Sequence, residues 1–231
     1  MNRALTIAID GPAASGKSTL GAALAERLGY TYFDSGVVYR ALTWLALERG
    51  VDVRDEMELV RLAESARIEV VRPTAGDGRQ YTVLVDGQDA TWSLRTPAVD
   101  HNVSVVAAHP GVRRAMTEWL RQIAGGGAMV MVGRDIGTVV LPGADLKVYL
   151  TATGEERARR RYREQLERSL QAEYDQILAE MRRRDELDSG RAIAPLRPAP
   201  DAIILDSDHL TVDEEIDQVL QHLALSEVAT R

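Results

Sequence analysis

The segment that most constrains this chain is a glycine-rich loop between two regular elements. Residues 5–9 (LTIAI) form an apolar, β-branched run that Asp10-Gly11-Pro12 ends, which predicts a buried strand. Residues 17–28 (KSTLGAALAERL) carry apolar positions at helical spacing. The loop between them, GPAASGKS, fits the pattern G-x-x-x-x-G-K-[ST]. A strand before this pattern and a helix after it predict a phosphate-binding loop, or P-loop.

The residue types of this loop suit a nucleoside triphosphate. Glycines let the backbone turn its N–H groups toward a phosphate, and the helix N-terminus adds the positive end of a dipole. Lys17 supplies a compact charge that can follow a transferring group, and Ser18 offers a hydroxyl to Mg²⁺. Lys17 and Lys147 are the only lysines, so a lysine at this position needs an explanation. The alternative is an ordinary glycine-rich turn between a strand and a helix.

The rest of the chain alternates strand and helix patterns. After the first strand, strands are predicted at 31–33, 128–132, 146–150 and 201–206. Helices are predicted at 37–49, 97–108, 111–124 and 212–224, with a charge-dense helical stretch from 154 to 191. This order predicts an α/β fold, a doubly wound parallel sheet of about five strands.

Two segments stand apart from that core. Residues 67–72 and 81–86 flank a Gly-Asp-Gly turn, which predicts a small antiparallel β insert over 66–95. Residues 154–191 contain ten arginines and ten acidic residues, and we expect a helical lid that closes over the triphosphate and excludes water. Most of these arginines would form a solvated helix face. The core P-loop domain then comprises 1–65, 96–153 and 192–231.

Composition narrows the function classes. The chain has 28 basic and 35 acidic residues, a net charge of −7, which argues against a protein that coats nucleic acid. Cysteine is absent, which excludes disulfides and thiol chemistry. No run of about 18 apolar residues predicts a membrane span, and the first residues lack the pattern of a secretion signal. We expect a cytoplasmic monomer without nucleic-acid or membrane partners.

A kinase and a nucleotide-driven switch are the two classes open to such a loop. A guanine-nucleotide switch needs Asn-Lys-x-Asp, and neither asparagine of this chain precedes a lysine. A kinase also needs a second pocket that binds an anion, the phosphate of the acceptor. Ser35 and Arg40 follow the second strand, and Arg134-Asp135 follows the strand at 128–132. Ligands bind beyond the carboxyl ends of parallel strands, and arginine can hold a phosphate bidentately. Taken singly, Arg40 could be a solvated helix residue and Asp135 a loop cap.

Several longer motifs then resemble the bacterial cytidylate kinases, within the nucleoside monophosphate kinase group. The matching pieces occur in order along nearly the whole chain: IDGPAASGKST, DSGVVYRALTW, the insert ending in LRT, HPGVRRAM, VGRDIGTVVLPGADLKVYL, RRRDELDSGRAIAPL and DAIILDS. The resemblance implies transfer of the γ-phosphoryl group of ATP to CMP or dCMP, with Mg²⁺. Two alternatives stay open: a kinase for another small acceptor, and a nucleotide-binding regulator that has lost phosphoryl transfer.

The resemblance also implies roles for individual residues. Lys17, Arg134 and Arg184 would be catalytic, and Ser18 would contact the metal. The ATP site would comprise Gly11, Pro12, Ala13, Ala14, Ser15, Gly16, Lys17, Ser18, Thr19, Arg157 and Arg161. The CMP site would comprise Ser35, Arg40, Ser104, Arg113, Arg134, Asp135, Arg184, Asp188 and Arg191.

These acceptor residues have distinct tasks in that interpretation. Arg40 and Arg134 would hold the phosphate, and Arg184 and Asp188 would reach the pentose, with Ser104 supporting Asp188. Ser35, Arg113, Asp135 and Arg191 would contact cytosine. Asp135 and Ser35 can accept from the exocyclic amino group and Arg113 can donate to N3 and O2, whereas uracil would leave buried groups unpaired.

The sequence departs from the family pattern in two places. Ala14 stands where the family more often has a glycine, and we expect it still to allow the loop. Segment 90–95 (ATWSLR) also differs, which affects the geometry of the insert.

Overall fold

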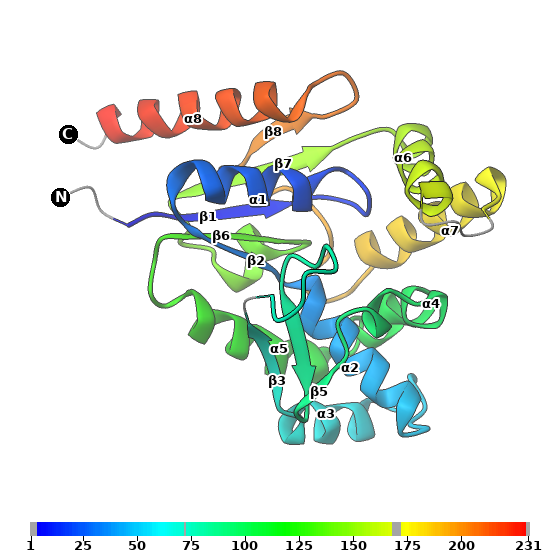
Figure 1. Cartoon of the computed structure of the whole chain (residues 1–231). Helices are drawn as coiled ribbons and strands as arrows, with labels where there is room; N and C mark the ends of the chain where they lie inside the picture. The colour runs from blue at the N-terminus through cyan, green and yellow to red at the C-terminus, as the bar shows by residue number, and fades with distance from the viewer. Residues whose placement is uncertain (1–3, 72, 168–171, 230–231) are drawn as a thin grey trace. The chain divides into compact units, whose positions relative to one another are not determined.

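The computed structural model describes residues 4–71, 73–167 and 172–229, and the chain forms two compact units. The first unit takes the described residues of 1–34 and 123–231, and the second takes residues 35–122 (Figure 1). Each unit has its own sheet, one parallel and one antiparallel.

The first unit is built on a five-stranded parallel sheet, as the sequence predicts. The strand order is β2-β6-β1-β7-β8. The strands are β1 (Thr6–Asp10), β2 (Thr31–Asp34), β6 (Met129–Gly133), β7 (Leu146–Thr151) and β8 (Ile203–Asp206). β1 lies at the centre, and its last residue, Asp10, pairs with Gly133, the last residue of β6. The two strands therefore end at the same level.

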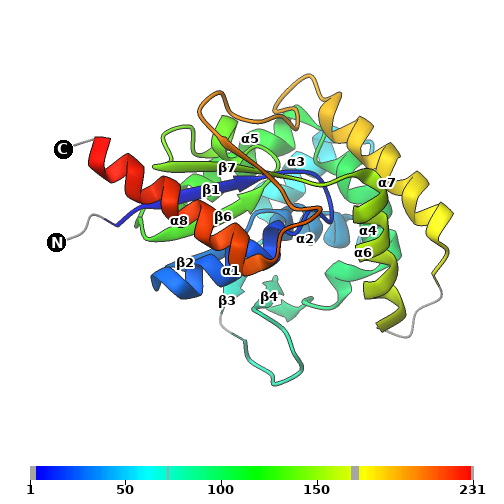
Figure 2. The same cartoon turned by 90° about the horizontal axis from the view of Figure 1, so that it is seen from above.

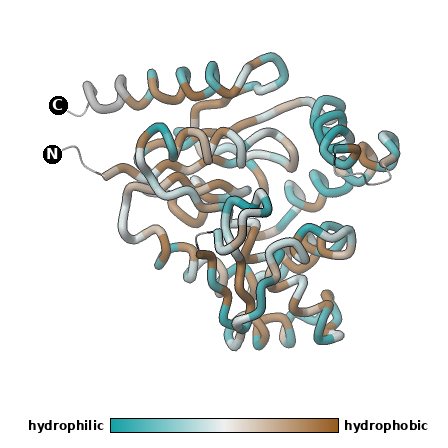
Figure 3. Tube along the Cα trace, in the orientation of Figure 1, coloured by the Kyte–Doolittle hydropathy of each residue, from teal (hydrophilic) through white to brown (hydrophobic). Residues whose placement is uncertain are grey.

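One face of this sheet is covered by α1 (Lys17–Leu28) and α8 (Val212–Ala229), which lie side by side (Figures 1 and 2). Ile7 and Ile9 of β1, Leu20 of α1 and Val219 of α8 are fully buried in one cluster. Figure 3 shows much of the hydrophobic colour in the region of this sheet. A parallel sheet buries both of its faces, so its strands appear in the sequence as continuous apolar runs rather than alternating ones.

The charge-dense segment 154–191 forms two helices, α6 (Gly154–Glu167) and α7 (Tyr174–Ser189). Residues 168–171 of the predicted lid lie outside the described residues. The pair has a small apolar core, and Tyr162 and Tyr174 meet edge to face with ring centroids 6.4 Å apart. Hydrophilic residues dominate the rest of α6 (Figure 3). The helical content of the segment is confirmed, and its closure over ATP stays a prediction.

The second unit is organised around α2 (Gly36–Glu48), most of whose residues are buried. Packed near it are α3 (Glu56–Ser65), the short 3₁₀ turn η1 (Ser93–Arg95) and α4 (Pro97–Val106), with α5 (Pro110–Ala124) following. The antiparallel sheet comprises β3 (Ile68–Val71), β4 (Thr82–Val85) and β5 (Gln88–Asp89). The antiparallel insert is confirmed, and its short third strand was not predicted.

Helix α3 was also not predicted, although its start carries a recognisable signal. Asp55 precedes the helix, and its side chain accepts a hydrogen bond from the Glu58 N–H at 3.1 Å. Such a cap satisfies one of the N–H groups that the first helical turn leaves without a partner.

A cluster around Arg79 closes the β insert where segment 90–95 departs from the family pattern. The Arg79 guanidinium contacts the Asp77 carboxylate at 2.7 Å and the Asp89 carboxylate at 2.5 Å. Asp77 also accepts the indole N–H of Trp92 at 2.8 Å. Hydrogen bonds from Thr91 and Arg79 lower the pKa of Asp89 to about 2. Polar contacts of Trp92 and Thr91 therefore hold this segment.

Among the described residues, no helix is long and apolar enough to cross a membrane.

The start of α8 gives a prediction about pH and stability. Glu215 is only 4% exposed, and burial raises the pKa of its carboxyl to about 7, with Arg160 opposing the shift. A pKa higher in the folded than in the unfolded chain means that stability falls as pH rises from about 4.5 to 7. Glu215→Gln removes the cost of ionising this buried carboxyl. We therefore expect the free energy of unfolding to rise by about 1–3 kcal/mol at pH 8 and to stay unchanged near pH 4.5. Urea unfolding at the two pH values measures this.

Glu214 is the matched control because its surroundings lower the pKa of its carboxyl, whereas those of Glu215 raise it. It accepts the backbone N–H and the hydroxyl of Thr211, each at 2.8 Å, which lowers the pKa of its carboxyl. Glu214→Gln should destabilise at pH 8, and its effect should fade toward low pH. An equal response of the two variants to pH would contradict the interpretation of Glu215.

Candidate active site

The P-loop connects the end of β1 to the start of α1 through left-handed backbone. Gly11 has φ of 152°, and a Cβ there would lie 2.0 Å from the carbonyl oxygen of Leu150, so this position admits only glycine. Gly16 has φ of 97° and directly precedes α1. Ala14 also takes a positive φ, of 57°. The expectation that Ala14 allows the loop is confirmed, at a strain of about 1 kcal/mol relative to glycine.

Lys17 is the first residue of α1, and its side chain folds back into the P-loop. It is 6% exposed, and its Nζ donates to the carbonyl of Pro12 at 2.5 Å and to the Ser15 hydroxyl at 3.3 Å. Burial and the neighbouring charge of Arg134 lower the pKa of Lys17, whereas Asp34 and Asp10 oppose this shift. The loop thus encloses a compact cation with acidic groups nearby.

Ser18 and Asp34 bring two oxygen donors together. The Ser18 hydroxyl donates to the Asp34 carboxylate at 3.4 Å. The described residues contain no group of three or more His, Cys, Asp or Glu side chains that could hold a metal. Mg²⁺ commonly takes only one or two protein oxygens and completes its shell with phosphates and water. The Ser18–Asp34 pair fits that requirement.

The turn after β6 carries Arg134 and Asp135, and Arg134 meets a buried carboxylate from α7. The Arg134 Nε donates to Asp188 Oδ2 at 3.0 Å, and Arg191 pairs with Oδ1 of the same residue. The side chain of Asp188 is 2% exposed and that of Arg191 is 4% exposed. Burial would raise the pKa of Asp188, but Arg134, Arg191 and Arg184 outweigh it and lower the pKa. The carboxylate therefore stays ionised among three arginines.

Of the two lid arginines assigned to ATP, Arg157 is the more tightly held. Its Nη1 donates to the carbonyl of Ala13 in the P-loop at 3.2 Å, and its Nε donates to the carbonyl of Ala152 at 3.1 Å. Two further bonds, at 3.1 and 2.6 Å, reach the Asp185 carboxylate. Arg161 contacts Glu164 at 2.9 Å one turn along the same helix. Contact of either arginine with ATP stays a prediction.

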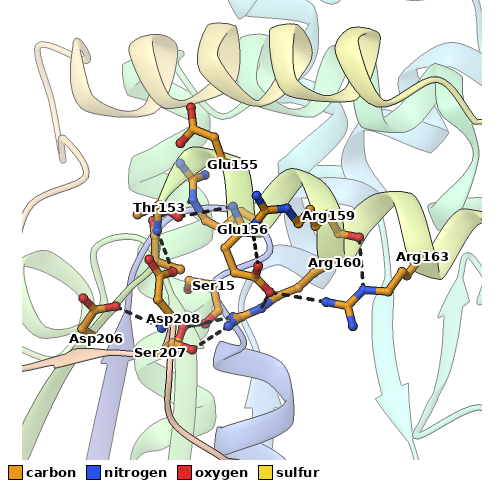
Figure 4. A network of polar contacts seen from close by, with 12 residues as sticks. Ser15, Thr153, Glu155, Glu156, Arg159, Arg160, Arg163, Asp206, Ser207 and Asp208 are labelled. Carbon is orange, nitrogen blue, oxygen red and sulfur yellow. Dashed lines mark hydrogen bonds and ion pairs between the residues drawn. The ribbon is translucent and has the colours of Figure 1, made fainter.

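A third arginine of α6, Arg160, lies in a network that sequence reasoning missed (Figure 4). Its Nη1 donates to the Ser207 hydroxyl at 3.0 Å and its Nη2 to the Ser207 carbonyl at 2.6 Å. The Ser207 hydroxyl lies 3.0 Å from the carbonyl of Ser15 in the P-loop and 3.0 Å from that of Thr151. Ser207 therefore connects the ends of β7 and β8 to the P-loop and to α6. Its sequence signals were its place just after a strand and at the end of the DAIILDS motif.

The second unit contains four predicted acceptor residues, three on helices α2, α4 and α5 and one just before α2. Arg40 donates to the Leu94 carbonyl at 2.9 Å and to the Asp100 carboxylate at 2.6 Å. Ser104 lies four residues after Asp100 on α4, hence on the same helix face. Sequence reasoning missed Asp100, whose spacing from Ser104 was its only signal.

Arg113 and Ser35 are the other two predicted acceptor residues in the second unit. Arg113 is 3% exposed, donates to the Ala107 carbonyl at 3.0 Å, and stacks over the Tyr39 ring 5.3 Å from its centroid. Ser35 directly precedes α2 and is 4% exposed. Both residues are therefore almost fully enclosed by the second unit.

Each unit thus gathers part of the predicted site. The first unit holds the P-loop, Arg134, Asp135, Arg157, Arg161, Arg184, Asp188 and Arg191. The second holds Ser35, Arg40, Ser104 and Arg113.

A P-loop at the end of the central strand of a parallel sheet, with three arginines around a buried carboxylate in the same unit, defines the class of P-loop nucleotide-binding proteins. A solved structure of an uncharacterized protein from Eubacterium ventriosum aligns with a TM-score of 0.53. The alignment covers 95% of this chain and 98% of that chain at 11% identity, so it supports the fold alone.

Comparison with known sequences assigns the chain to one family within this class. The family model "Cytidylate kinase" matches residues 7–225. A cytidylate kinase from Chloroflexus aggregans is 53% identical, covering 97% of this chain and 96% of its own length. One from Herpetosiphon aurantiacus is 50% identical, covering 93% and 92%. The chain belongs to the cytidylate kinase family.

The contacts of the two lid arginines predict unequal effects on stability. Replacing Arg157 with Ala leaves two carbonyls and the Asp185 carboxylate without a partner, so we expect a loss of about 2–4 kcal/mol in unfolding free energy. Replacing Arg161 with Ala removes an ion pair with Glu164 between two partly exposed side chains, so we expect a smaller loss than for Arg157. Urea unfolding of both variants measures the difference. Equal losses would contradict a structural role for Arg157.

Proposed function

We propose that this chain transfers the γ-phosphoryl group of ATP to CMP or dCMP, giving CDP or dCDP and ADP. The observation that carries the proposal is its membership of the cytidylate kinase family over residues 7–225, together with a fully formed P-loop. The expected cytoplasmic location and monomeric state stay predictions.

The reaction needs position and charge more than covalent chemistry. An oxygen of the acceptor phosphate attacks the γ-phosphorus, and the bond from that phosphorus to the β,γ-bridging oxygen breaks, releasing ADP. A phosphate monoester is mostly doubly ionised at neutral pH, so the attacking oxygen needs no side-chain base. We assign Lys17, Arg134 and Arg184 to the negative charge that spreads over the transferred group.

The loop residues Gly11 to Thr19 surround the triphosphate, and the backbone N–H groups of the loop, which Pro12 lacks, donate to its oxygens. Arg157 and Arg161 are further contacts to ATP. The chemistry that Mg²⁺ would supply here is neutralisation of part of the charge of the triphosphate. Ser18 and Asp34 would hold the ion, because their oxygens already lie together at the ends of the P-loop and β2.

The acceptor assignments follow the family resemblance and agree with the chemistry of each residue. Arg40 and Arg134 bind the phosphate, for which a fork of donors is suited. Arg184 and Asp188 bind the pentose, with Ser104 in support. Cytosine is bound by Ser35, Arg113, Asp135 and Arg191. Asp135 is 3% exposed, so its carboxylate can discriminate strongly between an amino group and a carbonyl oxygen.

The first test is replacement of Lys17 with Ala. Because Lys17 supplies the charge inside the P-loop, we expect kcat to fall by roughly 10²- to 10⁴-fold. The measurement is ADP formation with ATP, Mg²⁺ and CMP. The control is Arg159→Ala on α6, whose exposed side chain pairs with Glu156 at 3.2 Å on the same helix. Near-normal turnover of the Lys17 variant would refute its role.

The second test concerns the acceptor. With CMP, dCMP, UMP, AMP and GMP offered separately, we expect turnover mainly with CMP and dCMP. Replacing Asp135 with Ala should raise KM for CMP by roughly 10- to 100-fold and leave KM for ATP within about threefold, because the contact to the base is lost while the residues of the P-loop are unchanged.

Each other outcome has a definite meaning. Equal losses for CMP and ATP would remove Asp135 from the acceptor site. Strong turnover with another monophosphate would contradict the base assignments, and turnover with none would favour a nucleotide-binding regulator.

A further inference from the structure

The residue that ends β1 makes contacts that the proposed mechanism does not use. Asp10 directly precedes the first glycine of the P-loop and is 4% exposed. Its Oδ1 accepts the N–H of Ile136 and its Oδ2 accepts the N–H of Gly137, both at 2.7 Å. One carboxylate on β1 thus binds two consecutive backbone donors that are about 126 residues away in sequence.

These two donors begin an unusual turn. Residues Ile136–Val140 form a short π-helical turn, η2, that follows Asp135 directly. The first N–H groups of any helical turn lack partners within it, so they need an external acceptor when buried. The Asp135 carbonyl accepts the N–H of Val139 at 2.8 Å and that of Val140 at 3.1 Å. The backbone of Asp135 is therefore anchored through the same turn that Asp10 holds.

The turn is also confined from its other side. A Cβ placed on Gly137 would lie 3.4 Å from Asp10 Oδ2 and 3.1 Å from the side-chain Cδ of Lys147. Lys147 is itself fixed, because its ammonium group contacts the Asp201 carboxylate at 2.8 Å. A Cβ here would therefore be closer to the lysine stem than ordinary contact allows, and either the stem or the turn would have to move by a few tenths of an ångström.

We propose that Asp10 is a positioning residue, which fixes the Arg134–Asp135 turn relative to the P-loop and thereby sets the discrimination between cytosine and uracil. Asp10 touches the turn rather than the base, and it acts through Asp135. The inference rests on the proposed assignment of Asp135 to the cytosine amino group.

The ionisation of Asp10 agrees with this role at neutral pH. Burial raises the pKa of its carboxyl to about 6, with the two N–H donors opposing the shift. Asp135 also raises this pKa, and Lys17 lowers it. Above pH 6 the carboxylate can accept both backbone N–H groups, as the observed geometry requires.

The test is the ratio of kcat/KM for CMP to that for UMP. In Asp10→Asn one of the two N–H groups faces an amide NH₂ instead of an oxygen, so the turn must move. A misplacement of about 1 Å costs roughly 100-fold in such sites, and we expect the ratio to fall by at least about tenfold. A purely structural defect lowers the active fraction equally for both substrates and leaves the ratio unchanged.

Two further variants make the result interpretable. Gly137→Ala pushes the same turn against Lys147 without removing a charge, so it should lower the ratio even if Asp10→Asn fails to fold. Asp145→Asn is the matched control. Its carboxylate also accepts a backbone N–H across the sheet, from Thr6 at 2.8 Å, but just before β7 and at the start of β1. We expect it to cost stability and to leave the ratio unchanged.

The outcomes separate the two proposals. A lower ratio in the Asp10 and Gly137 variants, with Asp145→Asn unchanged, supports the inference. An unchanged ratio in both, while Asp135→Ala abolishes discrimination, overturns it and leaves the proposed function intact. An unchanged ratio in Asp135→Ala overturns the base assignment and the inference with it.

Discussion

The parallel pairing of β1 with β6 is the constraint on which the first unit depends. It sets Asp10 opposite Gly133, so the P-loop and the Arg134–Asp135 turn leave the sheet at the same level. Where parallel strands end, backbone N–H groups and charges must find partners outside the ladder. Asp10 supplies one such partner, because its carboxylate binds the turn after β6. The strand that delivers the phosphate loop therefore also shapes the neighbouring turn.

Buried charge is the second theme of the structure, and it depends on complete pairing. Lys17, Asp188 and Arg157 are all nearly inaccessible, and each has polar partners at hydrogen-bond distance. An unpaired ion in such places would cost several kcal/mol. Arginine suits these positions because its planar fork reaches several acceptors at once, as Arg157 does with two carbonyls and a carboxylate.

The contacts of Ser207 and Arg157 tie the P-loop to the ends of β7 and β8 and to α6 and α7. Phosphoryl transfer needs donors that are already oriented when charge develops, because reorganising them during the reaction would raise the barrier. Ser207 and Arg157 bind the carbonyls of Ser15 and Ala13, so they hold the outside of the loop and leave its N–H groups to the phosphate. These two contacts fix the positions of the Ser15 and Ala13 carbonyls in the loop.

The sequence by itself determined the P-loop, the places of the five strands along the chain and most helices, because these follow from patterns within a few neighbouring residues. The order of the strands in the sheet came only from the tertiary structure. The family motifs also placed Arg134, Asp188 and Arg191 in one site, and the structure joins them by ion pairs. Counting arginines could not separate Arg157 from Arg161, since both lie on one charged helix and only burial distinguishes them. The contacts of Asp10, Asp100 and Ser207 also could not be predicted from the sequence. Their partners lie about 47 to 192 residues away, and only the tertiary structure brings such groups within hydrogen-bond distance.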